Sequence, residues 1–103
     1  MTEPTTLRIF RYEVPVDGRW HEFHLFGEIL HVAMGRWKIV EFWAYSDGSS
    51  GRAVWLRVFG TDEPITDQIS RHHGTAIAAG GSPAWHLLEA HGITGELVRE
   101  DER

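Results

Sequence analysis

The sequence predicts a single antiparallel β domain of six or seven strands, arranged as a small sandwich or a partly open barrel. Three observations predict this fold. Apolar and polar residues alternate with a period of two between residues 7 and 59, which is the period of a half-buried strand. Glycine-containing turn signals such as Asp17-Gly18 separate these runs. The 103 residues make one domain, and 42% of them are hydrophobic, so the chain can fill one core.

The first two strands are expected over residues 7–16 and 19–26. Asp17-Gly18 lies between them and is the strongest short-range signal for a hairpin. A two-residue turn at this point places Tyr12 opposite Phe23 and Glu13 opposite Glu22. The sequence therefore predicts that these strands pair with each other.

The next strands are expected over 28–34, 37–45 and 52–59, and together they form a three-stranded meander. The turn at Gly35-Arg36 sets His31 opposite Val40, and the turn cluster at 46–52 sets Trp43 opposite Trp55. One face of this meander is apolar apart from His31, which we expect to be a neutral core histidine. The other face is also largely apolar, so both faces must be covered.

The pattern is weaker after residue 59. Residues 60–74 are expected to form a long loop or one irregular helical turn, and a short strand is expected over 74–79. Residues 84–89 are expected to form the last strand. A short helix over 84–91 is the alternative, because Ser82, Pro83 and Gly92 are suited to its N-cap, first turn and end. The domain spans 7–92, with a disordered tail over 1–6 and an acidic tail over 93–103.

Composition excludes several classes of protein. The chain has no cysteine, which excludes a disulfide scaffold and thiolate metal sites. No apolar run is long enough to span a bilayer, and residues 1–6 do not resemble a signal peptide, so we expect a cytoplasmic protein. Arg19-Trp20 and Arg36-Trp37 combine cations with aromatics, as single-strand nucleic-acid binders do, but the net charge of −5 opposes this role.

One polar cluster is a candidate catalytic or metal site. If the first hairpin forms, two carboxylates oppose each other and require a compensating cation, metal or shared proton. Such a group could bind a divalent ion or support hydrolysis, while the alternative is a solvated face of flexible side chains. The cluster consists of Arg11, Glu13, Glu22 and His24. His72, His73, His86 and His91 could also gather in space, although histidines in loops are commonly just exposed.

The second apolar face of the meander indicates an interface. A small chain has few residues left to cover two faces, and exposed apolar clusters mark interaction sites. We therefore expect a homodimer that uses one patch twice. The expected interface residues are Met34, Trp37, Trp43, Trp55 and Phe59.

Several segments resemble a family of small uncharacterised proteins from actinobacteria and their tailed phages. The resemblance covers residues 8–89. It rests on Arg11-Tyr12-Glu13-Val14-Pro15-Val16-Asp17-Gly18-Arg19-Trp20-His21, Ile29-Leu30-His31-Val32-Ala33, Val40-Glu41-Phe42-Trp43-Ala44, Arg57-Val58-Phe59-Gly60-Thr61, Gly74-Thr75-Ala76 and Trp85-His86-Leu87-Leu88-Glu89. It implies a closing strand at the last of these segments. Pro83 and a longer tail depart from the family pattern, and no catalytic residue is carried over.

Together these observations predict a small non-enzymatic phage or bacterial accessory protein. It is expected to act in the cytoplasm by binding a protein, either a second copy of itself or a host protein, without a cofactor or metal. A metal- or small-ligand-binding barrel with hydrolytic activity at Glu13, Glu22 and His24 is the first alternative. A single-stranded nucleic-acid binder is the second.

Overall fold

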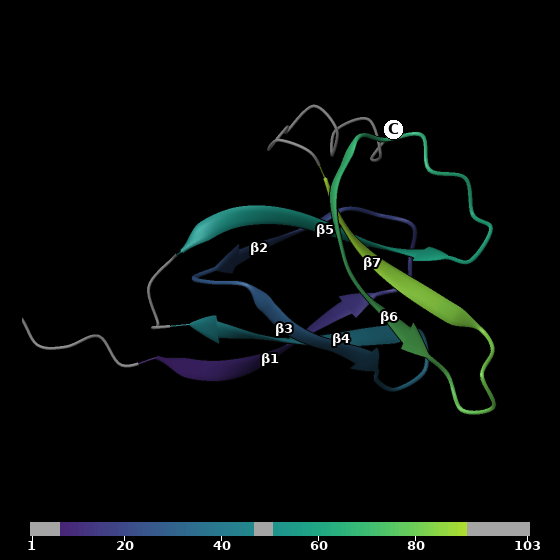
Figure 1. The fold of residues 1–103 in the computed structure, drawn as a ribbon, viewed down its shortest axis with the longest axis horizontal. Coiled ribbons are helices and arrows are strands. Elements are labelled where there is room, and N and C mark those ends of the chain that lie inside the picture. Colours follow the sequence, from purple (N-terminus) through teal and green to yellow (C-terminus); the bar gives the residue numbers. More distant parts are fainter. Residues whose placement is uncertain (1–6, 47–50, 91–103) are drawn as a thin grey trace, which may run out of the picture.

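The protein is an antiparallel β-sandwich (Figure 1). The computed structural model describes residues 7–46 and 51–90, and these residues form seven strands and no helix. A three-stranded sheet has the order β1-β4-β3, and a four-stranded sheet has the order β2-β5-β7-β6. The strands are β1 (Arg8–Pro15), β2 (His21–Leu25), β3 (Ile29–Met34), β4 (Ile39–Ser46), β5 (Arg52–Gly60), β6 (Ile69–Ile77) and β7 (Ala84–Ala90). The predicted fold class is confirmed.

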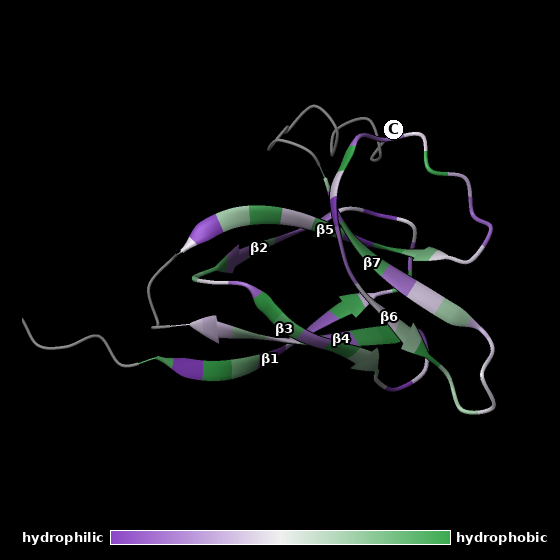
Figure 2. Cartoon of the chain, viewed as in Figure 1, coloured by the Kyte–Doolittle hydropathy of each residue, from purple (hydrophilic) through white to green (hydrophobic). Residues whose placement is uncertain are grey.

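The core lies between the two sheets. Alternate residues of the central strands β4 and β5 point inward, and the alternation of hydrophilic and hydrophobic residues is visible along β5 in Figure 2. Phe42 of β4 is fully buried and stacks on Tyr12, with ring centroids 4.9 Å apart, while Phe23 meets it edge-on at 5.2 Å. The other fully buried residues of this core include Val14, Val40, Ala44, Val54, Leu56, Val58 and Leu87. The apolar face predicted over 40–58 is this core.

The predicted hairpin at Asp17-Gly18 is wrong. β1 pairs with β4 and β2 pairs with β5, so the two strands lie in different sheets. The apolar faces of both strands meet across the core instead of side by side: Tyr12 and Phe23 are in edge-to-face contact at 6.0 Å. Glu13 consequently lies opposite Glu41, and Glu22 lies opposite Trp55.

The connection between β4 and β5 also passes from one sheet to the other. The meander predicted over 28–59 is therefore wrong, since β5 pairs with β2 and β7 and not with β4. Trp43 and Trp55 are not neighbours on one face. Residues 47–50 of the predicted turn lie outside the described residues, as do the predicted tails. Alternation alone does not show whether two consecutive strands pair in one sheet or lie in opposite sheets, because the same side chains are buried in both cases.

The pairing of β3 with β4 is confirmed, but in a different register. Met34 lies opposite Val40 and His31 lies opposite Trp43, where the sequence predicted Val40 opposite His31. The loop uses four residues and includes Lys38 at a φ of 57°, and a bulge at Leu30 reverses the alternation of the strand. His31 is therefore exposed on the outer face and is not a core histidine.

A second apolar cluster covers the outer face of the four-stranded sheet. Phe59 and Leu88 are buried there beneath Trp20, whose ring packs on Phe59 with centroids 6.0 Å apart. The chain segment that follows β5 closes over this cluster, because Trp20 Nε1 donates a hydrogen bond of 3.2 Å to Asp67. This sheet is thus covered on both sides by its own chain.

The C-terminal part of the domain contains more strand than the sequence predicts. β6 begins at Ile69, inside the expected loop. It pairs with β7, and the register of this pairing shifts at two places. Residues 84–90 form a strand, so the favoured prediction is confirmed and the helical alternative is wrong. β7 is a central strand, between β5 and β6, which explains why Leu87 and Leu88 are both buried, one on each face.

Candidate binding site at one end of the sandwich

The predicted polar cluster is divided between the two sheets. Arg11 and Glu13 lie on β1, and Glu22 and His24 lie on β2. Each carboxylate has its own basic neighbour: Glu13 lies 3.5 Å from Arg36, and Glu22 lies 3.7 Å from His24. Within residues 7–46 and 51–90, no three histidine or acidic side chains lie close enough to hold a metal ion. The opposed carboxylate pair on which the hydrolytic alternative depended does not form.

The five expected interface residues occupy three different places. Trp55 and Phe59 belong to the second apolar cluster and are covered by the chain. Trp43 lies on the outer face of the three-stranded sheet, where its ring is 5.5 Å from that of His31. Met34 and Trp37 lie at one end of the sandwich, and Trp37 is 82% exposed, the highest value among the exposed large hydrophobic residues described.

Met34 and Trp37 line an apolar pocket of about 380 Å³. The loop between β3 and β4 forms one wall, and the loop between β6 and β7 forms the other. Trp85, at the start of β7, contributes a second indole, and Lys38 Nζ lies 4.8 Å from the centroid of the Trp37 ring. The remaining lining residues are Gly35, Ala78 and Pro83. Two indoles, a thioether and a proline ring make this a surface for an apolar group.

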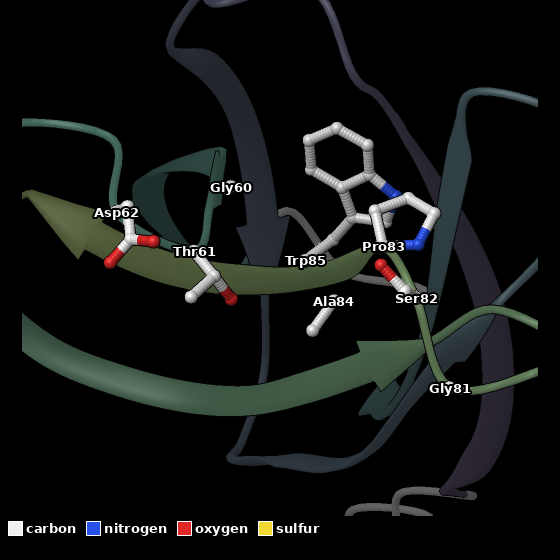
Figure 3. A pocket seen from close by; sticks show the side chains of 8 residues that line it. All are labelled: Gly60, Thr61, Asp62, Gly81, Ser82, Pro83, Ala84 and Trp85. Atoms are coloured by element: carbon white, nitrogen blue, oxygen red, sulfur yellow. The ribbon is translucent and has the colours of Figure 1, made fainter.

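A more polar hollow of about 470 Å³ adjoins this pocket and shares Pro83 and Trp85 with it. Figure 3 shows these two rings at one end of the hollow and Thr61 and Asp62 at the other. Asp62 has a φ of 73°, which is uncommon for a residue other than glycine, and it is the second residue after the end of β5. The polar side chains here can hydrogen-bond a group that is anchored in the apolar pocket.

Two histidines extend the polar side of the site. A third pocket, of about 280 Å³, shares Thr61 and Asp62 with the hollow and is lined by His72 and His86. His86 Nε2 lies 3.0 Å from Thr61 Oγ1, and its Nδ1 lies 3.1 Å from Thr75 Oγ1 and 3.3 Å from His72 Nε2. Two threonine hydroxyl groups and the His72 ring are the hydrogen-bond partners of this imidazole among the described residues.

The expectation for the histidines is met in part. His72 and His86 come together, but His73 lies at a bulge of β6 and contacts Glu89 at 2.7 Å. That contact is largely buried, and Glu89 also lies 3.4 Å from Arg52. His91 lies outside the described residues.

The sequence did not indicate Trp85 as a site residue. Its ring reaches the pocket only because β7 pairs with β5, a strand distant in sequence. This pairing sets Trp85 opposite Gly60. Pro83 two residues before Trp85, after Gly80-Gly81, was the available signal: a sharp turn that presents two rings together.

Fold and site define a class: a two-sheet β domain with a surface pocket between two of its loops. The chain belongs to the family described as a domain of unknown function, DUF7352, which matches residues 5–95. The expected membership of an uncharacterised family is confirmed at this level. No curated protein and no solved structure matches the chain. The described residues contain no helix that is long and apolar enough to cross a membrane.

Proposed function

We propose that this domain is a protein-binding module whose apolar pocket, formed by Met34, Trp37 and Trp85, takes an apolar side chain of a partner polypeptide. The observation that supports it is the exposure of Trp37, which is 82% exposed at the rim of this pocket. Exposed tryptophan is costly in water, and tryptophan is enriched among the residues that dominate binding energy at protein interfaces.

The surroundings of the pocket suit a peptide. Apolar anchors bind in concave sites whose rims carry hydrogen-bonding groups, and here the hollow beside Pro83 supplies Thr61, Asp62 and Ser82. The partner would place one large apolar side chain between Trp37 and Trp85 and lay polar backbone across the hollow. This division explains why one end of the site is apolar and the other is polar.

The biological setting is proposed from the resemblance described above. It implies a bacterial or phage accessory protein of actinobacterial origin that acts in the cytoplasm, where a host protein would be the partner. The same module is proposed to form a homodimer. Of the expected interface residues, Trp43 lies on a sheet face that residues 7–46 and 51–90 do not cover, and that face is distinct from the Trp37 pocket.

The test is selection of peptides from a random library on the immobilised domain. We expect enriched peptides to share one large apolar residue and to lose binding to Trp37→Ser. The substitution is safe for folding, because this side chain is almost fully solvated. Phe26→Ser is the matched control: it also removes an exposed ring, at the opposite end of β3, and binding should persist. Failure to enrich any peptide, or equal binding to both variants, would refute the proposal.

A further inference from the structure

The outer face of the three-stranded sheet is not covered by the described part of the chain. Its alternate residues point away from the core, and Ile9 and Tyr45 on this face are 56% and 39% exposed. Strand pairing arranges the face in four rows, from one end of the strands to the other. In order they are Ile9 with Tyr45, then Arg11 with Trp43 and His31, then Glu13 with Glu41 and Ala33, and then Pro15 with Ile39.

The chemistry of these rows has a definite order: apolar, basic with aromatic, acidic, apolar. If a second face of the same kind is laid on it with the strands reversed, the basic row meets the acidic row and the apolar rows meet each other. A two-fold axis that lies in the interface and crosses the strands at right angles produces this reversal. β1 then faces β1 of the other copy, with Arg11 against Glu13 at two equivalent positions.

We infer that a second copy of this chain packs on the outer face of the three-stranded sheet, related by that two-fold axis. The ion pairs within one chain are compatible with this packing of a second copy. Arg11 lies 3.4 Å from Glu41 and Glu13 lies 3.5 Å from Arg36, and the Arg11 and Arg36 side chains are more than half exposed. Such solvated pairs hold little free energy. Burial between two sheets removes water from them and strengthens the attraction between copies.

The size of the face sets the strength of the dimer. Three strands of about eight residues cover roughly 14 by 25 Å, from the usual strand spacing and rise. Two such faces bury roughly 700 Å² in total, which is below the usual range of stable specific interfaces, so we expect weak, reversible association that depends on concentration. Trp43, at the centre of the face, is the aromatic anchor that such an interface commonly has.

A single-stranded nucleic acid is the competing occupant, because Trp43, Tyr45 and Arg11 could stack on bases and attract phosphate. The acidic row crosses the path that a phosphate backbone would take along β1 and β4, and the chain carries a net charge of −5. Charge therefore favours a second copy, which brings its own basic row to the acidic one.

The test is sedimentation velocity over a concentration series, with Arg11→Glu and Glu13→Arg as separate variants. Each variant places like charges against each other twice, so we expect self-association to weaken by about tenfold or more. Arg19→Glu and Glu22→Arg are the matched controls, with the same changes of charge at exposed sites outside this face, and they should associate as the unmodified chain does.

An equimolar mixture of the two variants is the decisive sample. Arg11→Glu in one chain then faces Glu13→Arg in the other, both contacts are attractive, and a heterodimer should form although neither variant associates alone. No repair of a folding defect explains this result. The inference is overturned if the unmodified chain stays monomeric at high concentration, or if the mixture does not associate. It is also overturned if a labelled oligothymidine binds the chain and loses affinity with Arg11→Glu. None of these outcomes depends on the Trp37 pocket.

Discussion

Gly74 shows how closely the two sheets approach along one side of the sandwich. It lies on β6, the edge strand of one sheet, and a Cβ added there would be 2.9 Å from Val32 on β3, the edge strand of the other. Val32 is buried, so its methyl groups cannot move into solvent. The absence of a side chain at this position allows the edges to close over the core.

Gly74→Ala is therefore expected to destabilise the domain by about 1–3 kcal/mol, the usual cost of overpacking a core. Gly27→Ala is the control, since a Cβ there would meet Tyr45 at an ordinary 3.8 Å and its φ lies outside the positive range. Urea unfolding followed by tryptophan fluorescence measures both. Equal urea midpoints for the two variants would show that β6 can shift to accommodate the added methyl group. The close approach of the two sheets would then not constrain residue 74.

At the scale of elements, Glu63 makes two of the hydrogen bonds that hold the segment between β5 and β6. Glu63 accepts a hydrogen bond of 2.9 Å from Arg57 and another of 2.9 Å from the backbone amide of Gly60. Arg57 in turn lies over the Phe59 ring, at 4.2 Å from its centroid. This carboxylate thus ties the loop to the second apolar cluster, and the same loop carries Thr61 and Asp62 into the candidate site.

Glu63→Ala should release this loop without unfolding the sheets. A hydrogen bond to a charged group is worth about 1.5–3 kcal/mol, so amides of residues 60–68 should exchange hydrogen roughly tenfold faster or more. Thr66→Ala, an exposed change in the same loop, should leave exchange unchanged. Hydrogen exchange measured by mass spectrometry separates the variants. Unchanged protection in Glu63→Ala would mean that Asp67 and Trp20 hold the loop alone.

The same scale explains what sequence reasoning predicts well and what it does not. Strand identity and the buried face follow from alternation, which is why Val40, Phe42 and Val54 were assigned to the core correctly. Pairing partners were assigned from the turns, and this succeeded for β3 with β4 but failed at Asp17-Gly18. A turn signal marks where a strand ends, whereas the sheet that the next strand joins depends on contacts distant in sequence.

The candidate site shows the same contrast between local patterns and contacts that are distant in sequence. Met34 lies directly before a local turn and Trp37 lies within it, so the sequence placed them together. Trp85 joins them only through the loop that contains Pro83, about forty-five residues away along the chain, and no local pattern carries that information. The carboxylate pair Glu13 and Glu22 was inferred from one register, and it was lost together with that register.

At the scale of the whole molecule, Phe42 links both sheets. Its ring lies on β4 of the three-stranded sheet, stacks on Tyr12 of β1 and meets Phe23 of β2 edge-on. β1 and β2 lie in different sheets, and so do β4 and β5, so neither sheet is a contiguous stretch of chain. Neither sheet can be completed locally, which predicts that the two form and unfold as a single cooperative unit.

Phe42→Ala tests this cooperativity. Truncating a buried phenylalanine costs about 3–5 kcal/mol, a large part of the stability of a domain of this size. We expect the urea midpoint to fall strongly, and amides of β4 and of β5 to lose protection by the same factor, since one global opening exposes both. Phe10→Ala, a partly exposed ring on β1, should shift the midpoint far less. Loss of protection confined to β1, β3 and β4 would show that the sheets unfold separately, and that the crossed connections do not couple them.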